Sequence, residues 1–282
     1  MIPADSRLDQ HLVRAGLARS RNVAQRLIRA GSVQVDGRQI DKPSYAVQPG
    51  QQVSVVDDDT SRWVGRGALK LLHALTIWGS AAPSQPVSDE RRLLRVEGRR
   101  ALDVGASTGG FTQVLLKHGV DHVTALDVGH DQLVAELADD PRVTDLPGTN
   151  IRDVDPEQVG TFDVVVGDVS FISLQIVLPA VAPLLAPGGD VVFLVKPQFE
   201  VGRDRLGRGG VVTSAAERTR TLEQVVAVAT GLDWHVHGLA ASPVAGAHGN
   251  REYLLWLATS TAGMMSAVDT TARIHELTGE DD

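Results

Sequence analysis

From residue 99 onward, short apolar runs alternate with longer segments in which apolar residues recur every three or four positions. The short runs predict strands, and the longer segments predict amphipathic helices. The expected strands cover residues 101–104, 123–128, 143–146, 163–166, 190–195, 236–240 and 253–258, and the expected helices cover 110–118, 130–138, 172–185 and 215–230. This alternation indicates a doubly wound, mostly parallel α/β sheet of seven strands. Further helices are expected over 68–78 and near 262–282.

The beginning of the chain follows a different pattern. Two short apolar stripes at helical spacing predict a helix over residues 6–13 and a second helix that follows its N-cap Ser20 and carries Val23, Ala24, Leu27 and Ile28 on one face. Gly16 and Gly31 are placed to end these helices. Residues 33–35, 39–42 and 53–56 predict short strands, with a hairpin turn at Asp36-Gly37. The pattern therefore predicts a small α+β domain.

A polar break over residues 57–60 separates the two patterns. We predict an N-terminal domain over residues 1–59, a linker over 60–67 and a larger domain over 68–282. Residues 80–98 are rich in proline, serine and charge, which indicates an exposed loop, and no function is assigned to them.

Charge is distributed unevenly between these parts. The whole chain has a net charge of −8. Residues 1–56 hold eight Arg and Lys against four Asp, a net charge of +4, which leaves −12 for the remainder. A small basic domain can follow a phosphate backbone although the whole protein is acidic.

Composition excludes several classes. The chain has no cysteine, so disulfides and cysteine nucleophiles or ligands are excluded. No stretch of about 18 apolar residues occurs, and the first residues contain no apolar core of a signal peptide. We therefore expect a cytoplasmic protein without a membrane partner. His235 and His237 would share a strand, but they lack other ligands nearby, so no metal site is expected.

The sequence DVGASTGGFT over residues 103–112 ends the first strand of the sheet and opens a helix. Glycines there let a ligand approach the backbone, and the helix start offers free N–H groups. Asp127 ends the second strand about 20 residues later, where a carboxylate suits a ribose diol. The loop matches neither a dinucleotide fingerprint nor a Walker loop. We expect a cofactor with an adenosine moiety; a structural turn beside a solvated aspartate is the alternative.

Four further segments make a family resemblance specific: RGALK over 66–70, GDVSFISL over 167–174, LVKPQFE over 194–200 and NREY over 250–253. With them the chain resembles the TlyA, or haemolysin A, family of rRNA 2′-O-methyltransferases. The resemblance implies a Rossmann-like class I methyltransferase fold of the FtsJ-like type. The N-terminal part resembles the RNA-binding domain of ribosomal protein S4, and Arg62-Trp63-Val64 resembles the family's interdomain motif.

The resemblance also implies functional residues and a cofactor. The FtsJ-like tetrad of Lys, Asp, Lys and Glu falls on Lys70, Asp168, Lys196 and Glu252. S-adenosyl-L-methionine is the implied cofactor, with contacts at Gly109, Phe111, Asp127, Asn150 and Asp168, to which the loop adds Asp103, Gly105, Ser107 and Thr108. Asn150 stands where related enzymes often have aspartate.

These residue types suit methylation of a ribose 2′-hydroxyl, which is a poor nucleophile at neutral pH. We place Lys196 nearest the hydroxyl, as a base or as a charged group that stabilises the developing alkoxide. Asp168 would orient it, and Lys70 and Glu252 would complete the charge network. Taken singly, Lys70 and Glu252 have a plainer interpretation as solvated charges.

The N-terminal arginines supply the expected RNA contact. The set consists of Arg7, Arg19, Arg21, Arg26 and Arg29. These side chains would bind backbone phosphates, unless they only form a solvated helix face. The resemblance implies rRNA cytidines within ribosomal subunits as targets, in the large subunit and with the small subunit as a second candidate, and an effect on capreomycin sensitivity. No obligate protein partner is inferred.

Three alternatives stay open. A base N-methyltransferase would commonly carry prolines after the fourth strand, where this chain has Asp168-Val-Ser-Phe171. A non-catalytic ribosome-assembly factor would keep the fold without binding the cofactor. The haemolysin name implies a membrane activity, for which the sequence offers neither a spanning helix nor barrel-like alternation.

The loop over residues 202–210 is either a lid over RNA or a plain connection.

Overall fold

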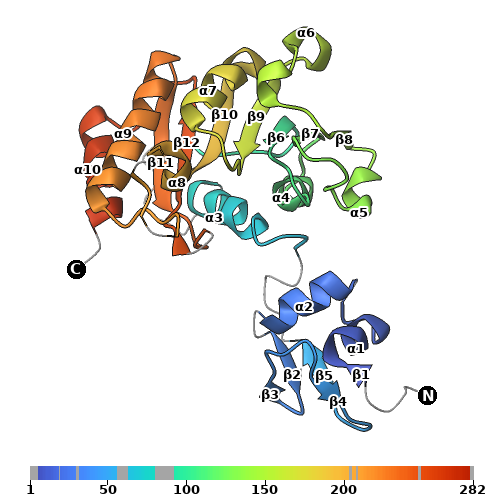
Figure 1. Cartoon of the computed structure of the whole chain (residues 1–282). Coiled ribbons are helices and arrows are strands. Elements are labelled where there is room, and N and C mark those ends of the chain that lie inside the picture. The colour runs from blue at the N-terminus through green and yellow to red at the C-terminus, as the bar shows by residue number, and fades with distance from the viewer. Residues whose placement is uncertain are drawn as a thin grey trace. The chain divides into compact units, whose positions relative to one another are not determined.

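The computed structural model describes residues 6–18, 20–29, 32–55, 63–79, 92–202, 205–207, 209–246 and 249–279. Figure 1 shows the course of the chain through its helices and strands. Contacts within the chain define two compact units, residues 1–63 and 64–282, and each is described by itself.

The first unit combines two helices with two small antiparallel sheets. Its elements are β1 (Ser6–Arg7), α1 (Leu8–Arg14), α2 (Arg21–Arg29), β2 (Val33–Val35), β3 (Arg38–Gln39), β4 (Ala46–Val47) and β5 (Val53–Val55). The strand orders are β1-β4 and β3-β2-β5. Leu8, Leu12, Leu27 and Ile28 bury the apolar stripes of both helices against β2. Such a small core owes its stability chiefly to this burial.

The local signals in the first unit act as expected. Ser20 Oγ accepts a hydrogen bond from the backbone N–H of Val23 at 3.3 Å, as an N-cap does. Asp36 and Gly37 turn the chain with φ of +51° and +78°, which matches the hairpin turn expected from their types. The pairing of β1 with β4 was not expected, because two-residue strands carry no periodicity.

The second unit is an α/β sandwich. Its strands are β6 (Arg100–Val104), β7 (His122–Leu126), β8 (Val143–Leu146), β9 (Phe162–Gly167), β10 (Leu185–Val195), β11 (His235–Ala241) and β12 (Tyr253–Ala258). Its helices are α3 (Ala68–Trp78), α4 (Gly110–Lys117), α5 (Ala135–Ala138), α6 (Pro156–Val159), α7 (Leu174–Val181), α8 (Pro197–Glu200), α9 (Ala215–Gly231) and α10 (Ala267–Gly279), with short 3₁₀ turns η1 (Ile151–Asp153) and η2 (Ala182–Leu184).

All seven strands join one sheet in the order β11-β12-β10-β9-β6-β7-β8, as Figure 1 shows. β12 is antiparallel to both neighbours, while the other neighbouring strands run parallel. The Rossmann-like fold with a seven-stranded sheet is therefore confirmed. The doubly wound order changes direction between β6 and β9, and ligands of open sheets bind at such a switch point.

Both faces of the sheet are buried. In β10, Val191, Phe193 and Val195 belong to the core that includes α7 and α9. Alternate residues of a strand point to opposite faces, so Trp256 of β12 faces away from that core. Its ring lies 5.8 Å from that of Trp78 in α3. The inner strands β9, β10 and β12 accordingly read as nearly continuous apolar runs, whereas the edge strand β8 does not.

Two helices are shorter than the sequence predicted. In place of a helix over 130–138, only Ala135–Ala138 is α-helical, because the side chain of Asp127 bonds Gly129 N and the Gln132 side chain in a turn. The helix expected over 172–185 begins at Leu174, after its N-cap Ser173, and gives way to η2 at Ala182. Pro183 lacks the N–H that an α-helix needs there.

The direction of the strands decides which residues meet. The parallel strands β6, β7, β9 and β10 all have their carboxyl ends at one edge of the sheet. Because β12 is antiparallel, its amino end lies at that same edge, with Val195 opposite Tyr253. Residues just after β9 and β10 therefore lie beside a residue just before β12.

Candidate active site

A glycine loop follows β6 and leads into α4. Gly105, Ser107 and Gly109 all have left-handed backbone conformations, with φ of +81°, +49° and +94°. A Cβ on Gly109 would lie 2.3 Å from Leu137 Cδ1, so a side chain there would clash as well as strain the backbone. The loop needs glycine because one of its faces packs closely against Leu137. The opposite face of the loop is not covered by this packing.

That face borders a cavity of about 800 Å³. It opens at the carboxyl ends of β6, β7, β9 and β10, the edge at which open α/β sheets bind ligands. All expected cofactor residues except Asp103 and Gly109 line it, namely Gly105, Ser107, Thr108, Phe111, Asp127, Asn150 and Asp168. Gly65, Arg66 and Lys196 also line it. A pocket of this size fits a drug-sized ligand such as a nucleoside cofactor.

Asp103 has a different place from the one expected. Its carboxylate is buried beneath the loop, where Oδ2 accepts hydrogen bonds from the N–H and hydroxyl of Thr112 at 2.9 and 2.7 Å. Burial raises the pKa of Asp103 to about 7, although the Thr112 bonds oppose the shift. Asp103 therefore holds the first turn of α4 to the end of β6, and it is not among the residues that line the cavity.

Asp127, directly after β7, and Asn150, directly before η1, both line the cavity. Asp127 accepts hydrogen bonds from Ser107 N, Gly129 N and Gln132 Nε2 at 2.8, 2.8 and 2.9 Å. These bonds fix its carboxylate at the rim of the cavity. Asn150 caps η1, with Oδ1 accepting from Arg152 N at 3.1 Å.

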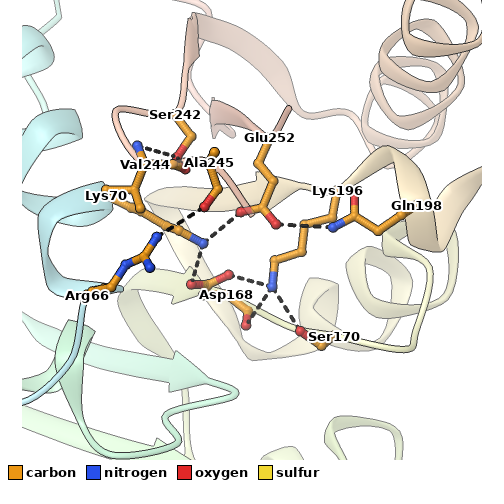
Figure 2. A network of polar contacts seen from close by, with 10 residues as sticks. All are labelled: Arg66, Lys70, Asp168, Ser170, Lys196, Gln198, Ser242, Val244, Ala245 and Glu252. Carbon is orange, nitrogen blue, oxygen red and sulfur yellow. Dashed lines mark hydrogen bonds and ion pairs between the residues drawn. The ribbon is translucent and has the colours of Figure 1, made fainter. Parts of the chain in front are cut away.

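The four residues of the expected tetrad meet in one ion network, shown in Figure 2. Lys70 Nζ lies 2.9 Å from Asp168 Oδ2 and 2.7 Å from Glu252 Oε2. Lys196 Nζ lies 2.7 Å from Asp168 Oδ1. Asp168 thus forms an ion pair with one lysine on each oxygen. The sequence alone also allowed Lys70 and Glu252 to be solvated surface charges. In the structure they are buried, with 7% and 4% of their surface exposed.

The electrostatics of the network follow from this pairing. Burial alone would lower the pKa of Lys70, but the attraction of Asp168 and Glu252 outweighs it and raises that pKa. Burial alone would raise the pKa of Asp168, and the two lysines instead hold it below its ordinary value. Lys70 therefore stays a cation and Asp168 an anion. Of the two lysines, only Lys196 lines the cavity.

Sequence reasoning missed residues that support the network. Gln198 Nε2 donates to Glu252 Oε1 at 3.1 Å, and Lys196 Nζ donates to Ser170 Oγ at 2.9 Å (Figure 2). Ser170 and Gln198 lie in two of the segments that carry the family resemblance. Their contact with the tetrad follows from the positions of the ends of β9 and β10 in the fold. Glu200 accepts from Ser173 and Leu174 N and so fastens α8 to α7.

Phe171 is a further residue of the cavity rim. Its side chain is 91% exposed, and its φ of +65° is unusual for an aromatic residue. Its ring lies 4.9 Å from that of Phe199, whose ring in turn faces Lys196 Nζ at 5.9 Å. An exposed aromatic face thus stands beside the tetrad.

In the first unit, Arg7 and Arg21 converge on one carboxylate. The buried Asp9 lies 3.1 Å from Arg7 Nε and 2.9 Å from Arg21 Nε, and it also accepts from Gln25. Burial alone would raise the pKa of Asp9, but these donors hold it well below its ordinary value. The arginine side chains remain 44% and 52% exposed. Arg19 lies outside the described residues.

Fold and site together define a class I methyltransferase, and comparison with known proteins supplies the family. Residues 63–259 match the FtsJ-like methyltransferase model, and residues 6–53 match the S4 domain model. The 16S/23S rRNA (cytidine-2′-O)-methyltransferase TlyA of Mycobacterium tuberculosis is 46% identical over 98% of each chain. The chain belongs to the FtsJ-like methyltransferases of the TlyA family.

Two further relatives carry the haemolysin name. Hemolysin A of Brachyspira hyodysenteriae is 35% identical over 88% of this chain and 98% of its own. A solved structure from Streptococcus thermophilus, also named a hemolysin, superposes with a TM-score of 0.71 at 36% identity and covers 99% of this chain and 98% of its own. Within the described part of the chain, no helix is both long and apolar enough to cross a membrane.

Proposed function

We propose that this protein transfers a methyl group from S-adenosyl-L-methionine to the ribose 2′-hydroxyl of a cytidine in ribosomal RNA. Its homologue from Mycobacterium tuberculosis is named as an enzyme of that activity. The observation that carries the proposal is the tetrad, in which Lys70, Asp168, Lys196 and Glu252 meet at one edge of the sheet beside the cavity.

The residues of the cavity fit this cofactor. Asp127 presents a carboxylate at the rim, where a ribose diol could donate to it. The glycine loop leaves the backbone accessible, and Asn150 supplies an amide for a purine edge. The bound cofactor would supply an electrophilic methyl group on a sulfonium. Phe111 and Asp168 would line the end of the cavity that receives it.

The tetrad then acts on the attacking oxygen. Lys196 would hold the 2′-hydroxyl by a hydrogen bond while its oxygen bonds to the methyl carbon and the bond from that carbon to sulfur breaks, with S-adenosylhomocysteine as the leaving group. The hydroxyl proton would go to Lys196 acting as a base, or to water while a charged Lys196 stabilises the developing alkoxide. Asp168 fixes the direction of the Lys196 ammonium, and Lys70 and Glu252 fix Asp168 in turn. Such positioning lowers the entropic part of the barrier.

Recognition of RNA is assigned to two features, the arginines of the first unit and Phe171. Arg7 and Arg21 of the first unit have side chains that are about half exposed and would contact phosphates, and the other arginines of the expected set lie in the same segment of the chain. Phe171 presents an aromatic face, which suits stacking on an unpaired base. The proposal includes a cytoplasmic location, because assembled ribosomal subunits are the expected substrate.

The test is transfer of labelled methyl groups from S-adenosyl-L-methionine to purified unmodified 30S and 50S subunits. Nuclease digestion and mass spectrometry then identify the methylated nucleoside. We expect 2′-O-methylcytidine, and the labelled subunit names the target. A base-methylated nucleoside, or no transfer to either subunit, would contradict the proposal.

A further inference from the structure

Gln132 makes contacts at the rim of the cavity that the proposed function does not use. It lies in the segment 128–134, between β7 and α5. Its Nε2 donates to Oδ1 of Asp127 at 2.9 Å, and its Oε1 accepts from Ser107 Oγ at 3.3 Å. All three residues line the cavity. The Gln132 amide therefore connects Asp127, which is expected to bind the ribose, to Ser107 of the glycine loop.

Three glycines make room for this segment. A Cβ on Gly129 would lie 1.7 Å from Gln132 Nε2, and a Cβ on Gly148 would lie 2.4 Å from His130 Nε2. A Cβ on Gly109 would lie 2.7 Å from Leu133 Cδ1. A side chain at any of these glycines would displace the end of a neighbouring side chain. The glycines therefore leave the space that the Gln132 amide occupies, and the Gln132 side chain itself is exposed.

The acceptor positions of Asp127 are nearly filled. A carboxylate offers two positions on each oxygen. Oδ1 accepts from Gly129 N and from Gln132 Nε2, so both of its positions are taken. Oδ2 accepts from Ser107 N, and in the described part of the chain its second position has no other donor. A diol that donates both hydroxyls to this carboxylate needs one position more than Asp127 has open.

We propose that Gln132 occupies, in the free protein, the position on Asp127 Oδ1 that one ribose hydroxyl of the cofactor takes on binding. The backbone donors Ser107 N and Gly129 N are fixed by the loop, whereas a glutamine amide leaves by rotating its side chain. Binding of the ribose then exchanges one hydrogen bond on Oδ1 for another. Gln132 thereby sets the affinity for the nucleoside, an inference that rests on the proposed cofactor.

The affinity of variants tests this exchange. Titration calorimetry of the full chain with S-adenosylhomocysteine should show a Kd about fivefold lower for Gln132→Ala than for wild type, since one net hydrogen bond no longer has to be broken. Gln132→Met keeps the length without the donor and should give the same change. The matched control is Gln158→Ala, because Gln158 Nε2 also donates to an aspartate, Asp155, at 3.0 Å but lies outside the cavity.

Ligands that lack one ribose hydroxyl identify the bond. The gain of Gln132→Ala should disappear for whichever of the 2′-deoxy and 3′-deoxy forms of S-adenosylhomocysteine lacks the hydroxyl that faces Oδ1. It should persist for the other form, which still displaces the amide.

An unchanged or higher Kd for Gln132→Ala, or a gain that persists with both deoxy ligands, would overturn the inference while leaving the proposed function intact. No binding of S-adenosylhomocysteine by the wild-type protein would overturn both.

Discussion

Lys70 lies between the buried carboxylate of Glu252 and the partly buried carboxylate of Asp168, and this placement decides what its substitution would do. Its ammonium is the shared partner of Asp168 and Glu252, whose side chains are 19% and 3% exposed. Removing one partner from a buried ion network lowers the free energy of unfolding by more than the intact network adds to it, because the remaining charges are then buried without a counter-charge. Lys70 is therefore as much a structural requirement of the site as a chemical one.

We expect Lys70→Met to lower the free energy of unfolding by about 3–5 kcal/mol, since it leaves two carboxylates facing each other in a buried site. The double variant Lys70→Met with Glu252→Gln should recover part of this loss, because one of the two charges is then absent. Chemical denaturation of wild type, both single variants and the double variant measures the cycle. Additive losses would contradict the account.

The residues of the tetrad could be predicted from the sequence, and their arrangement could not. Asp168 and Lys196 follow apolar strands, so their position at the edge of the sheet is a consequence of the fold. Glu252 joins them only because β12 is antiparallel, which no local pattern reveals. The roles of Gln132 and Asp9 were missed, since a polar residue in a loop and an acid in a short helix carry no periodic signal.

The joint between β6 and α4 is the element on which the cavity depends. Asp103 at the end of the strand holds Thr112 in the helix, and the glycine loop is closed between them. Its pKa of about 7 is far above that of an unfolded chain, about 3.9. The folded state thus binds this proton more tightly. The stability due to Asp103 is complete below about pH 4 and is lost as the pH rises to about 7.

Asp103→Asn should remove this pH dependence, because the amide does not ionise. Compared with the variant, the wild type should lose stability between about pH 4 and 7, by about 1.4 kcal/mol for each unit by which the pKa is raised. Tryptophan fluorescence during denaturation follows the second unit, which holds Trp78, Trp234 and Trp256. Parallel stability curves for the two proteins would refute the assigned burial of the charge.

At the scale of elements, periodicity predicted the strands of the sheet well and the short helices poorly. The runs from 101–104 to 253–258 each became one strand, because most of them are buried and have a strong apolar signal, whereas the edge strand β8 is largely exposed. The four-residue helices α6 and α8 were not expected, because they are shorter than the two helical turns over which an apolar stripe can be recognised. Loop-forming hydrogen bonds of Asp127 shortened α5.

The whole molecule joins a basic unit to an acidic one. Substitutions in the first unit should weaken RNA binding without changing cofactor binding. Arg7 and Arg21 share Asp9 as an anchor, so their guanidinium groups are held on the surface rather than free to move. If they contact phosphates, their loss weakens binding of RNA and lowers its dependence on salt. The cofactor cavity lies wholly within the second unit.

We expect the combined variant Arg7→Ala with Arg21→Ala to weaken binding to ribosomal subunits and to lower the slope of log affinity against log salt by about 1 to 2. The Kd for S-adenosylhomocysteine should not change. Arg142→Ala is the control, because Arg142 also pairs with an aspartate, Asp140, and is 46% exposed, but lies in the second unit. Equal loss of affinity in the control would count against a specific role.

Methyl transfer by wild type and Lys196→Ala to unmodified ribosomal subunits, measured in dinucleotides that resist alkali, shows directly whether the tetrad serves ribose methylation. Ribose methylation blocks alkaline cleavage at the modified position. We predict label in these dinucleotides with wild type and none with Lys196→Ala, while both proteins bind S-adenosylhomocysteine with similar Kd. Label from the variant at the wild-type rate, or label only in alkali-sensitive nucleotides, would contradict the account of the site.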